Sequence, residues 1–72
     1  MAKTRAVYKK LGVKLRQIRS ERNLTQERLA LEANLNRAYI GYIERGERKA
    51  SIETIEKIAK VLRIKLHELF RF

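Results

Sequence analysis

Gln26 to Arg45 read QERLALEANLNRAYIGYIER, and this stretch decides the fold. Its apolar and small residues recur at helical spacing, at Leu29, Ala30, Ala33, Leu35, Ile40 and Ile43. The segment Asn34-Leu35-Asn36 interrupts this rhythm. The pattern predicts two short helices packed tightly together, the second of which presents a polar face. On a small and strongly basic chain, such a helix-turn-helix is suited to the major groove of DNA.

The composition indicates a folded basic domain. The chain has 72 residues, and 18 Lys and Arg against 8 Asp and Glu give a net charge of +10, while 44% of the residues are hydrophobic. This charge favours a polyanionic partner, such as DNA, RNA or an anionic membrane surface. A single domain of this size, residues 1–72, buries only roughly 60% of its unfolded surface, so a partner subunit would stabilise it.

Several classes of protein are disfavoured by what the chain lacks. It has no Cys, so neither disulfides nor thiolate zinc sites are expected, and no motif indicates a cofactor or another metal. The first ten residues are basic without the apolar core of a signal peptide, and no long apolar run follows. We therefore expect a cytoplasmic protein at the nucleoid, with no membrane partner.

All regular elements are predicted to be helices, because no segment alternates as a strand does. The first helix carries an apolar stripe at Tyr8, Leu11, Leu15 and Ile18. It is expected to end near Arg22, with Asn23 in a left-handed cap conformation. The basic residues before Val7, Lys3 and Arg5, are interpreted as a loose arm.

Side chains that favour helix N-caps precede the next three helices, at Thr25, Asn36 and Ser51. The helices are expected at about residues 26–33, at about 37–45 with Gly46 closing, and from Ile52 onward. The core face of the last is predicted to comprise Ile52, Ile55, Ile58, Ala59 and Leu62. A short helix at 66–70 would complete an all-α, compact five-helix bundle.

The outward face of the third helix supplies the expected base contacts. With Ile40 and Ile43 inward, a rotation of about 100° per residue turns positions 38, 41, 42 and 45 outward. The guanidinium of Arg37 could form two hydrogen bonds to a guanine, which would discriminate against other bases by about 1–3 kcal/mol. Base contacts are therefore predicted for Arg37, Ala38, Gly41 and Tyr42. For Gly41, close approach to DNA and a merely tolerated glycine are equally good interpretations.

Phosphate contacts are predicted for a second set of residues, namely Thr25, Gln26, Asn36, Tyr39, Arg45, Arg48 and Lys49. Gln26 lies at a helix N-terminus, which attracts anions. The basic residues that follow the third helix would fix the register on DNA rather than read its sequence. The alternatives are a cap alone for Thr25, partial core cover for Tyr39 and a solvated surface charge for each basic residue.

Two charged residues are predicted to pair inside the fold. Arg19 lies one step from the apolar stripe of the first helix, and Glu44 lies one step from the inner face of the third. A pair would tie the two helices together, whereas the alternative is two independent surface charges.

The C-terminal segment 64–72 is predicted to form a dimer interface. Its apolar residues are Ile64, Leu66, Leu69, Phe70 and Phe72. Core packing is expected to account for Leu66 and Leu69, and the remainder would be an exposed apolar patch, which usually marks an interface. A two-fold homodimer would hold its two recognition helices about 34–36 Å apart, one turn of DNA.

From about Leu11 to Phe70 the chain resembles the Cro/CI-type helix-turn-helix family, or XRE family. The resemblance is carried by Leu24-Thr25-Gln26-Glu27, Leu29-Ala30, Ile40, Ile43-Glu44-Arg45-Gly46, Ile58-Ala59 and Glu68-Leu69-Phe70. It implies a lambda-repressor-like bundle that binds operator DNA, usually as a two-fold dimer. It also implies a buried ion pair on Arg19 and Glu44.

Residues 35–41 and 43–48 more narrowly resemble the controller proteins of restriction–modification systems. The resemblance implies palindromic operators, control over the timing of endonuclease expression, base contacts at Arg37 and its neighbour, and DNA contacts near Arg48. RNA polymerase is a further candidate partner, because activation would need it. Ala38 departs from the usual Thr, and Arg63 stands where the last loop often has Gly.

Other functions fit less well. A phage-type repressor, or an antitoxin-type regulator that acts partly through protein–protein contacts, is the alternative that the sequence separates poorly. An enzyme is not expected, because His67 is the only histidine and the acids show no catalytic pairing. A membrane-active helix and an RNA-binding protein are weaker still, since the whole chain has a globular pattern and no stacking platform.

Overall fold

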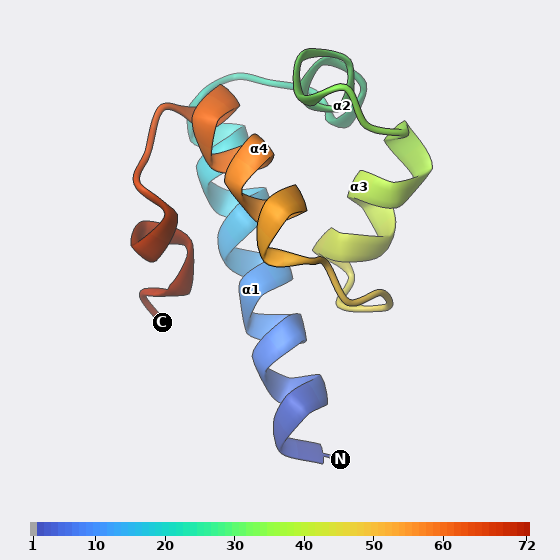
Figure 1. The fold of residues 1–72 in the computed structure, drawn as a ribbon, viewed down its shortest axis with the longest axis vertical. Helices are drawn as coiled ribbons and strands as arrows, with labels where there is room; N and C mark the ends of the chain where they lie inside the picture. The colour runs from blue at the N-terminus through green and yellow to red at the C-terminus, as the bar shows by residue number, and fades with distance from the viewer. Residues whose placement is uncertain (1) are drawn as a thin grey trace.

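The computed structural model describes residues 2–72, with side chains from Arg5 onward. It contains four α-helices and one 3-10 helix, which are α1 (Ala2–Glu21), α2 (Gln26–Ala33), α3 (Arg37–Glu44), α4 (Ile52–Leu62) and η1 (Leu66–Phe70) (Figure 1). Residues 2–72 contain no strand. The prediction of an all-α fold is therefore confirmed.

The predicted fifth helix is present but is a 3-10 helix, so the five-helix bundle is corrected to four α-helices and η1. Backbone bonds across three residues define this turn, such as the one from the Glu68 amide to the Lys65 carbonyl at 3.0 Å. The Glu68 carboxylate also accepts a bond of 2.7 Å from the Lys65 amide. These bonds tighten a segment too short to form a regular α-helix.

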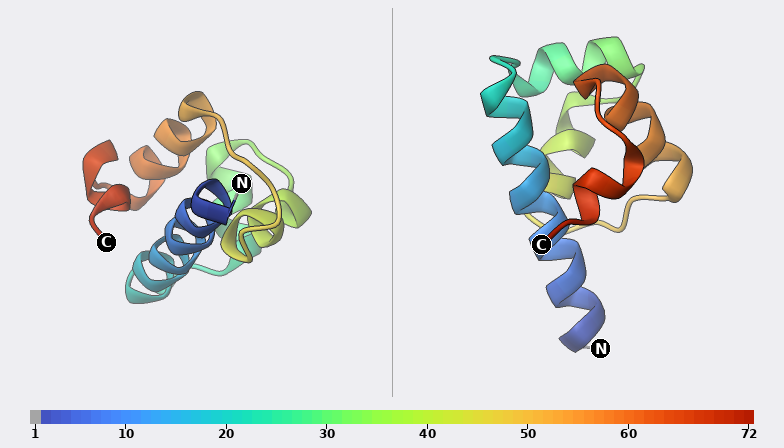
Figure 2. Two further views of the ribbon diagram at one scale, coloured as in Figure 1. Left: turned by 90° about the horizontal axis from the view of Figure 1, so that it is seen from below. Right: turned by 90° about the vertical axis from the view of Figure 1, so that its left-hand side faces the viewer.

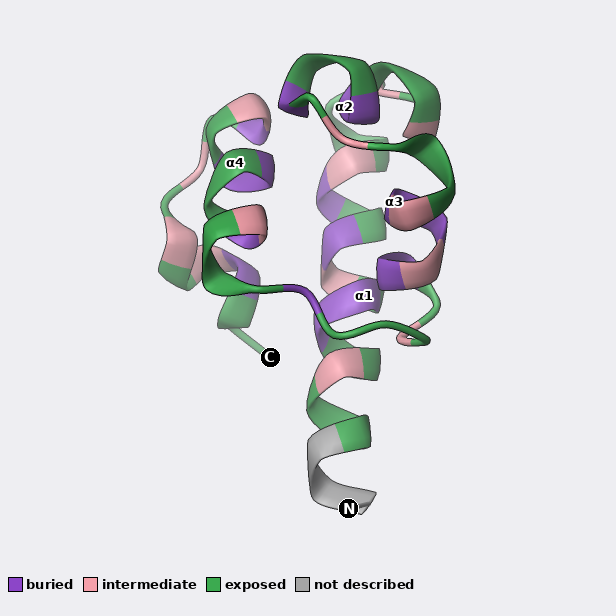
Figure 3. Ribbon diagram, turned by 45° about the vertical axis from the view of Figure 1, so that its right-hand side comes forward, coloured by how far each residue is buried: buried purple, intermediate pink, exposed green. Residues whose placement is uncertain are grey.

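The long helix α1 lies between α3 and η1 in the view of Figure 1, and it runs along one side of the molecule in the right-hand view of Figure 2. It packs against α3 on one side and η1 on the other, while α2 crosses one end and contacts both α3 and α4. The N-terminal turns of α1 extend beyond the bundle (Figure 3). No helix in residues 2–72 is long and apolar enough to cross a membrane.

The core forms where the predicted apolar stripes meet. Its residues are Leu11, Leu15, Ile18, Leu29, Ala30, Ile40, Ile43, Ala50, Ile55, Ile58, Ala59, Leu62 and Leu69. Ile52 was predicted to be in the core and is instead 62% exposed. It occupies the first position of α4, beyond the edge of the core, so its place in the helical pattern did not bury it.

The predicted helix caps are confirmed. The side chains of Thr25, Asn36 and Ser51 accept hydrogen bonds from the amides of residues 28, 38 and 54 at 3.0, 2.7 and 3.1 Å. Asn23 and Asn34 both adopt φ 57°, the left-handed conformation expected for turn residues. Arg63 also has a left-handed φ, of 59°, and closes α4.

The predicted loose arm is wrong for the backbone, because α1 already begins at Ala2. The segment before Tyr8 contains Ala, Lys and Arg, which favour helices, and neither Gly nor Pro. The side chain of Lys3, which was assigned to that arm, lies outside the described residues.

Candidate nucleic-acid interface

The turn between α2 and α3 is compact because of two adjacent residues. Asn34 has left-handed geometry, and the Leu35 amide donates to the Ala30 carbonyl at 2.8 Å. Ala30 is 2% exposed, and its small side chain lies in the core. The two helices of the motif therefore meet in a fixed geometry, with α3 on the side of the molecule away from η1 (Figure 1).

The carboxylate of Glu44 anchors the end of α3. Arg19 Nε donates to Glu44 Oε2 at 2.6 Å, and Arg19 Nη2 donates to Glu44 Oε1 at 3.1 Å. Arg19 Nη1 also donates to the Leu24 carbonyl at 2.6 Å. The two side chains are 12% and 3% exposed, so the pair predicted from the sequence is present and is shielded from water.

Gln26 adds a third hydrogen bond to the same carboxylate. Its Nε2 donates to Glu44 Oε1 at 2.9 Å, which links the first turn of α2 to the end of α3. Gln26 was predicted to contact phosphate, and this bond to Glu44 was not predicted. Nε2 has a second hydrogen, so the phosphate contact stays a prediction.

A glycine allows α1 to approach α3 closely. A Cβ at Gly12 would lie 2.4 Å from the carbonyl oxygen of Ile43 and 2.5 Å from that of Glu44. These are backbone atoms, which cannot turn aside as a side chain can. The absence of a side chain at position 12 therefore sets the distance between α1 and the C-terminal end of α3, which the sequence analysis did not anticipate.

The chain leaves α3 through a Schellman turn. The Gly46 amide donates to the Ile43 carbonyl at 3.0 Å, and the Glu47 amide donates to the Tyr42 carbonyl at 2.9 Å. Gly46 has φ 71°, and a Cβ there would lie 2.8 Å from the Cα of Lys9. Glycine is therefore required both by the backbone conformation and by contact with α1.

The basic face, defined as Arg37, Ala38, Arg45, Arg48 and Lys49, is exposed along α3 and the loop that follows. Arg37 is the first residue of α3 and Ala38 the second, so both lie at the end that would enter a groove. The other two residues with predicted base contacts, Tyr42 and Gly41, lie beside this face and are half-buried and buried, respectively.

Gly41 differs from the outward position predicted for it. A Cβ at Gly41 would lie 3.1 Å from Arg45 Nη1 and 3.8 Å from Gln26 Oε1. The arginine side chain therefore folds over the glycine and covers it. Backbone contact between Gly41 and a base would require the Arg45 side chain to move.

The remaining predicted phosphate residues already have contacts within the chain. Thr25 and Asn36 act as N-caps through their oxygens, as described above, and both side chains retain donors. Tyr39 is half-buried against the core, and its hydroxyl donates to the Lys49 carbonyl at 3.5 Å. DNA contacts by these residues stay predictions.

The aromatic ring of Tyr42 contacts two arginines of the site. The guanidinium carbons of Arg45 and Arg48 lie 5.2 and 4.7 Å from the centroid of the Tyr42 ring. Arg45 also donates to Glu47 at 3.1 Å. Tyr42 and Arg45 were predicted to share the outward face of the helix, with Arg48 following it, but the stacking was not predicted. The three-residue spacing of Tyr42 and Arg45 could have indicated their contact.

The C-terminal residues divide into a buried and an exposed group. Leu69 is 1% exposed and belongs to the core, in agreement with the core packing expected for it, so it is left out of the proposed dimer contact. Ile64 and Leu66 pack partly against the core. Phe70 and Phe72 are 37% and 54% exposed, with ring centroids 6.5 Å apart.

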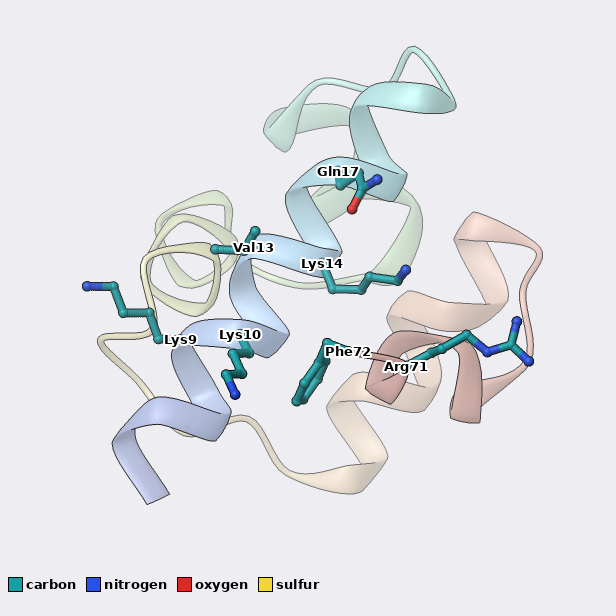
Figure 4. A pocket seen from close by; sticks show the side chains of 7 residues that line it. All are labelled: Lys9, Lys10, Val13, Lys14, Gln17, Arg71 and Phe72. Atoms are coloured by element: carbon teal, nitrogen blue, oxygen red, sulfur yellow. The ribbon is translucent and has the colours of Figure 1, made fainter. Parts of the chain in front are cut away.

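The exposed end of the chain adjoins a pocket of about 280 Å³ beside α1. Its lining residues are Lys9, Lys10, Val13, Lys14, Gln17, Arg71 and Phe72 (Figure 4). In this view Lys10, Lys14 and Arg71 lie around the Phe72 ring, whereas the amine of Lys9 points away from it. Among the residues with described side chains, no group of three or more His, Cys, Asp or Glu is placed to hold a metal ion.

Comparison with known proteins places this geometry in a family. A helix-turn-helix family model matches residues 15–69. Control protein C.BamHI of Bacillus amyloliquefaciens is 50% identical over 62 residues, which cover 85% of this chain and 76% of the relative. The crystal structure of the restriction-modification controller protein C.AhdI from Aeromonas hydrophila has a TM-score of 0.89 and 43% identity, over 90% of this chain and 98% of the other.

A second similar structure is of the master regulator for biofilm formation SinR in complex with DNA. It has a TM-score of 0.79 and 32% identity, over 82% of this chain and 95% of the other. The helix-turn-helix geometry, the buried Arg19–Glu44 pair and these similarities all indicate the same family. The chain belongs to the helix-turn-helix family of transcriptional regulators, and its relatives within that family include the controller proteins of restriction–modification systems.

Proposed function

We propose that this protein is a sequence-specific regulator that binds palindromic operator DNA as a homodimer and controls a restriction–modification system. The observation that carries the proposal is the basic face along α3 and the loop that follows, with the helix held by the buried Arg19–Glu44 pair. A cationic face on a firmly held helix and its adjoining loop, in a chain of net charge +10, suits the phosphate-lined major groove. Similarity to controller proteins supports the biological setting.

Arg37 is the proposed principal reader of sequence. It is exposed at the first position of α3, where a guanidinium can reach the O6 and N7 atoms of guanine. Ala38, also exposed, offers a methyl group to thymine. Contacts from Gly41 and Tyr42 remain part of the proposal, although Arg45 covers the glycine in the free protein.

Phosphate contacts are proposed on both sides of the reading helix. Arg45, Arg48 and Lys49 supply charge after α3, while Thr25, Gln26, Asn36 and Tyr39 supply neutral donors nearer the turn. Contacts of this kind orient the protein without selecting a sequence. Because each neutralised phosphate releases counterions, affinity should fall steeply with salt.

The exposed pair Phe70 and Phe72, with the half-buried Ile64 and Leu66, is the proposed dimer contact. A two-fold axis there would present two copies of α3 to successive major grooves, about 34–36 Å apart. Where the operator adjoins a promoter, RNA polymerase becomes a second partner of the bound dimer. Such a regulator would act in the cytoplasm, at the nucleoid.

Selection of bound duplexes from a random pool tests the proposal directly. The expected product is a palindrome with half-sites one turn apart, and log affinity should decrease linearly with log salt. A flat salt dependence, or no enrichment of any sequence, would contradict it. Neighbouring reading frames for a methyltransferase and an endonuclease would support the restriction–modification setting, whereas a toxin gene would favour an antitoxin-type role.

A further inference from the structure

The ring of Tyr42 holds two cations beside the basic face. The guanidinium carbons of Arg45 and Arg48 lie over it, at 5.2 and 4.7 Å from its centroid. Both distances are within about 6 Å, where a cation is attracted to the negative face of an aromatic ring. Two of the three cationic side chains that would meet DNA after α3, Arg45 and Arg48, are thus gathered on one aromatic ring.

The backbone places Arg48 beside this ring. The Schellman turn directs the chain back toward α3, because the Glu47 amide bonds to the carbonyl of Tyr42 itself. Gly46, packed against Lys9 of α1, fixes the turn. Arg48 follows immediately, so its approach to the ring results from the fold.

The two arginines differ in what else holds them. Arg45 lies across Gly41 and donates to Glu47 at 3.1 Å. Arg48 has no hydrogen bond or ion pair to any residue from Arg5 to Phe72. The ring of Tyr42 is therefore the contact that limits the freedom of the Arg48 guanidinium.

We propose that Tyr42 is a positioning residue, whose ring holds Arg45 and Arg48 in the orientation in which they meet DNA. Holding them in advance reduces the side-chain freedom lost on binding. This inference rests on the proposed function and deepens it. It assigns a function to the ring face of Tyr42, whereas the base contact proposed above would use its hydroxyl.

A thermodynamic cycle separates these two roles. The probes are a duplex selected by the wild-type protein and a duplex of random sequence. Tyr42→Leu should weaken binding to both about tenfold, since two arginine side chains that the ring no longer holds must then be ordered on binding. Tyr42→Phe, which keeps the ring, should recover the affinity that Tyr42→Leu loses on the random duplex, where no base contact of the hydroxyl contributes.

The cycle is completed in two backgrounds. In the Arg45→Ala/Arg48→Ala protein, adding Tyr42→Leu should change affinity by less than about twofold, because the ring has nothing left to position. In the matched Arg37→Ala background, the tenfold loss should persist. A tenfold loss in both backgrounds, or no loss from Tyr42→Leu in the wild-type background, overturns the inference.

A wrong proposed function can be told apart from a wrong inference about Tyr42. If the proposed function were wrong, the wild-type protein itself would show no salt-dependent binding to duplex DNA. A measurement without DNA tests the stacking in that case as well. Ring currents should displace the Nε–H resonances of Arg45 and Arg48 in wild type and Tyr42→Phe, and Tyr42→Leu should remove the displacement. Circular dichroism checks that each variant is folded, and unchanged arginine resonances in folded Tyr42→Leu overturn the inference.

Discussion

Arg19 and Glu44 join the first and third helices through hydrogen bonds of 2.6 and 3.1 Å. Their side chains are 12% and 3% exposed, so removal of either partner leaves the other charge buried and unpaired. Arg19→Ala is expected to lower the free energy of unfolding by about 3–5 kcal/mol. Urea denaturation at fixed protein concentration measures the change.

The matched control for this pair is Arg28→Ala, which breaks an exposed ion pair with Glu32. The two side chains of that pair are 61% and 39% exposed, and such pairs contribute about 0–1 kcal/mol. Equal losses in the two variants would show that burial does not strengthen the Arg19–Glu44 link.

Gly12 and Gly41 should respond in opposite directions to alanine. The Cβ of Gly12→Ala would lie 2.4 Å from a backbone oxygen, so the helices must move apart, at a cost of about 1–3 kcal/mol or more. The Cβ of Gly41→Ala would meet the end of the Arg45 side chain at 3.1 Å, which can turn aside. The helix should then gain about 0.5–1 kcal/mol.

Thermal unfolding of both glycine variants measures this contrast. Gly12→Ala should also weaken DNA binding, because α3 would be displaced from α1. A Gly12→Ala protein as stable as wild type would mean that the close approach of α1 to α3 is not required.

Arg37→Ala should remove sequence preference more than total affinity. Arg37 is the first residue of α3, and one bidentate hydrogen-bonded contact to a base contributes about 1–3 kcal/mol of discrimination between bases. Fluorescence anisotropy with selected and random duplexes measures the ratio of the two affinities. A preserved ratio in Arg37→Ala would assign sequence recognition to other residues.

Lys49→Ala is the complementary change. It should weaken binding to all duplexes similarly and reduce the salt slope by about one, as expected for a single phosphate contact. If the loss were confined to the selected duplex, Lys49 would contact a base instead.

Phe70 and Phe72 should affect assembly, whereas Leu69 should affect folding. Replacement of both exposed phenylalanines by Ala is expected to shift sedimentation toward monomer with little loss of protomer stability. Leu69→Ala removes a side chain that is 1% exposed and should cost about 2–5 kcal/mol. A wild-type protein that is monomeric at high concentration would contradict the proposed dimer.

Arg63→Gly should stabilise the fold. The arginine has φ 59°, a conformation that costs a residue with a Cβ about 1–2 kcal/mol. Glycine removes this cost, although the unfolded chain gains freedom, so a net gain of about 0.5–1 kcal/mol is expected. Lys65→Gly is the control, because φ there is −79° and glycine should destabilise.

Sequence reasoning succeeded where a pattern was local. The apolar spacing and the caps at Thr25, Asn36 and Ser51 located the helices, since capping depends on neighbours three residues or fewer apart. The sequence did not reveal the 3-10 geometry of η1 or the exposure of Ile52. Both depend on where the core ends in space.

The candidate site was predictable in its residues but less so in its contacts. The Arg19–Glu44 pair followed from positions beside two apolar stripes. The bond from Gln26 to Glu44, the Arg45 side chain over Gly41 and the stacking on Tyr42 depend on side-chain orientation. No spacing rule specifies those orientations in advance.

The attachment of the third helix to the first combines the Arg19–Glu44 pair and core side chains with two close main-chain contacts. These contacts lie at Gly12, beneath the carbonyls of Ile43 and Glu44, and just beyond the helix at Gly46, against Lys9. The exposed side chains at Arg37 and Ala38 take no part in that attachment. If Arg37 and Ala38 contact bases as proposed, substitutions at these two positions would change the operator sequence without loosening the scaffold. The same separation makes positions 37 and 38 the natural starting points for redesigning which DNA the protein recognises.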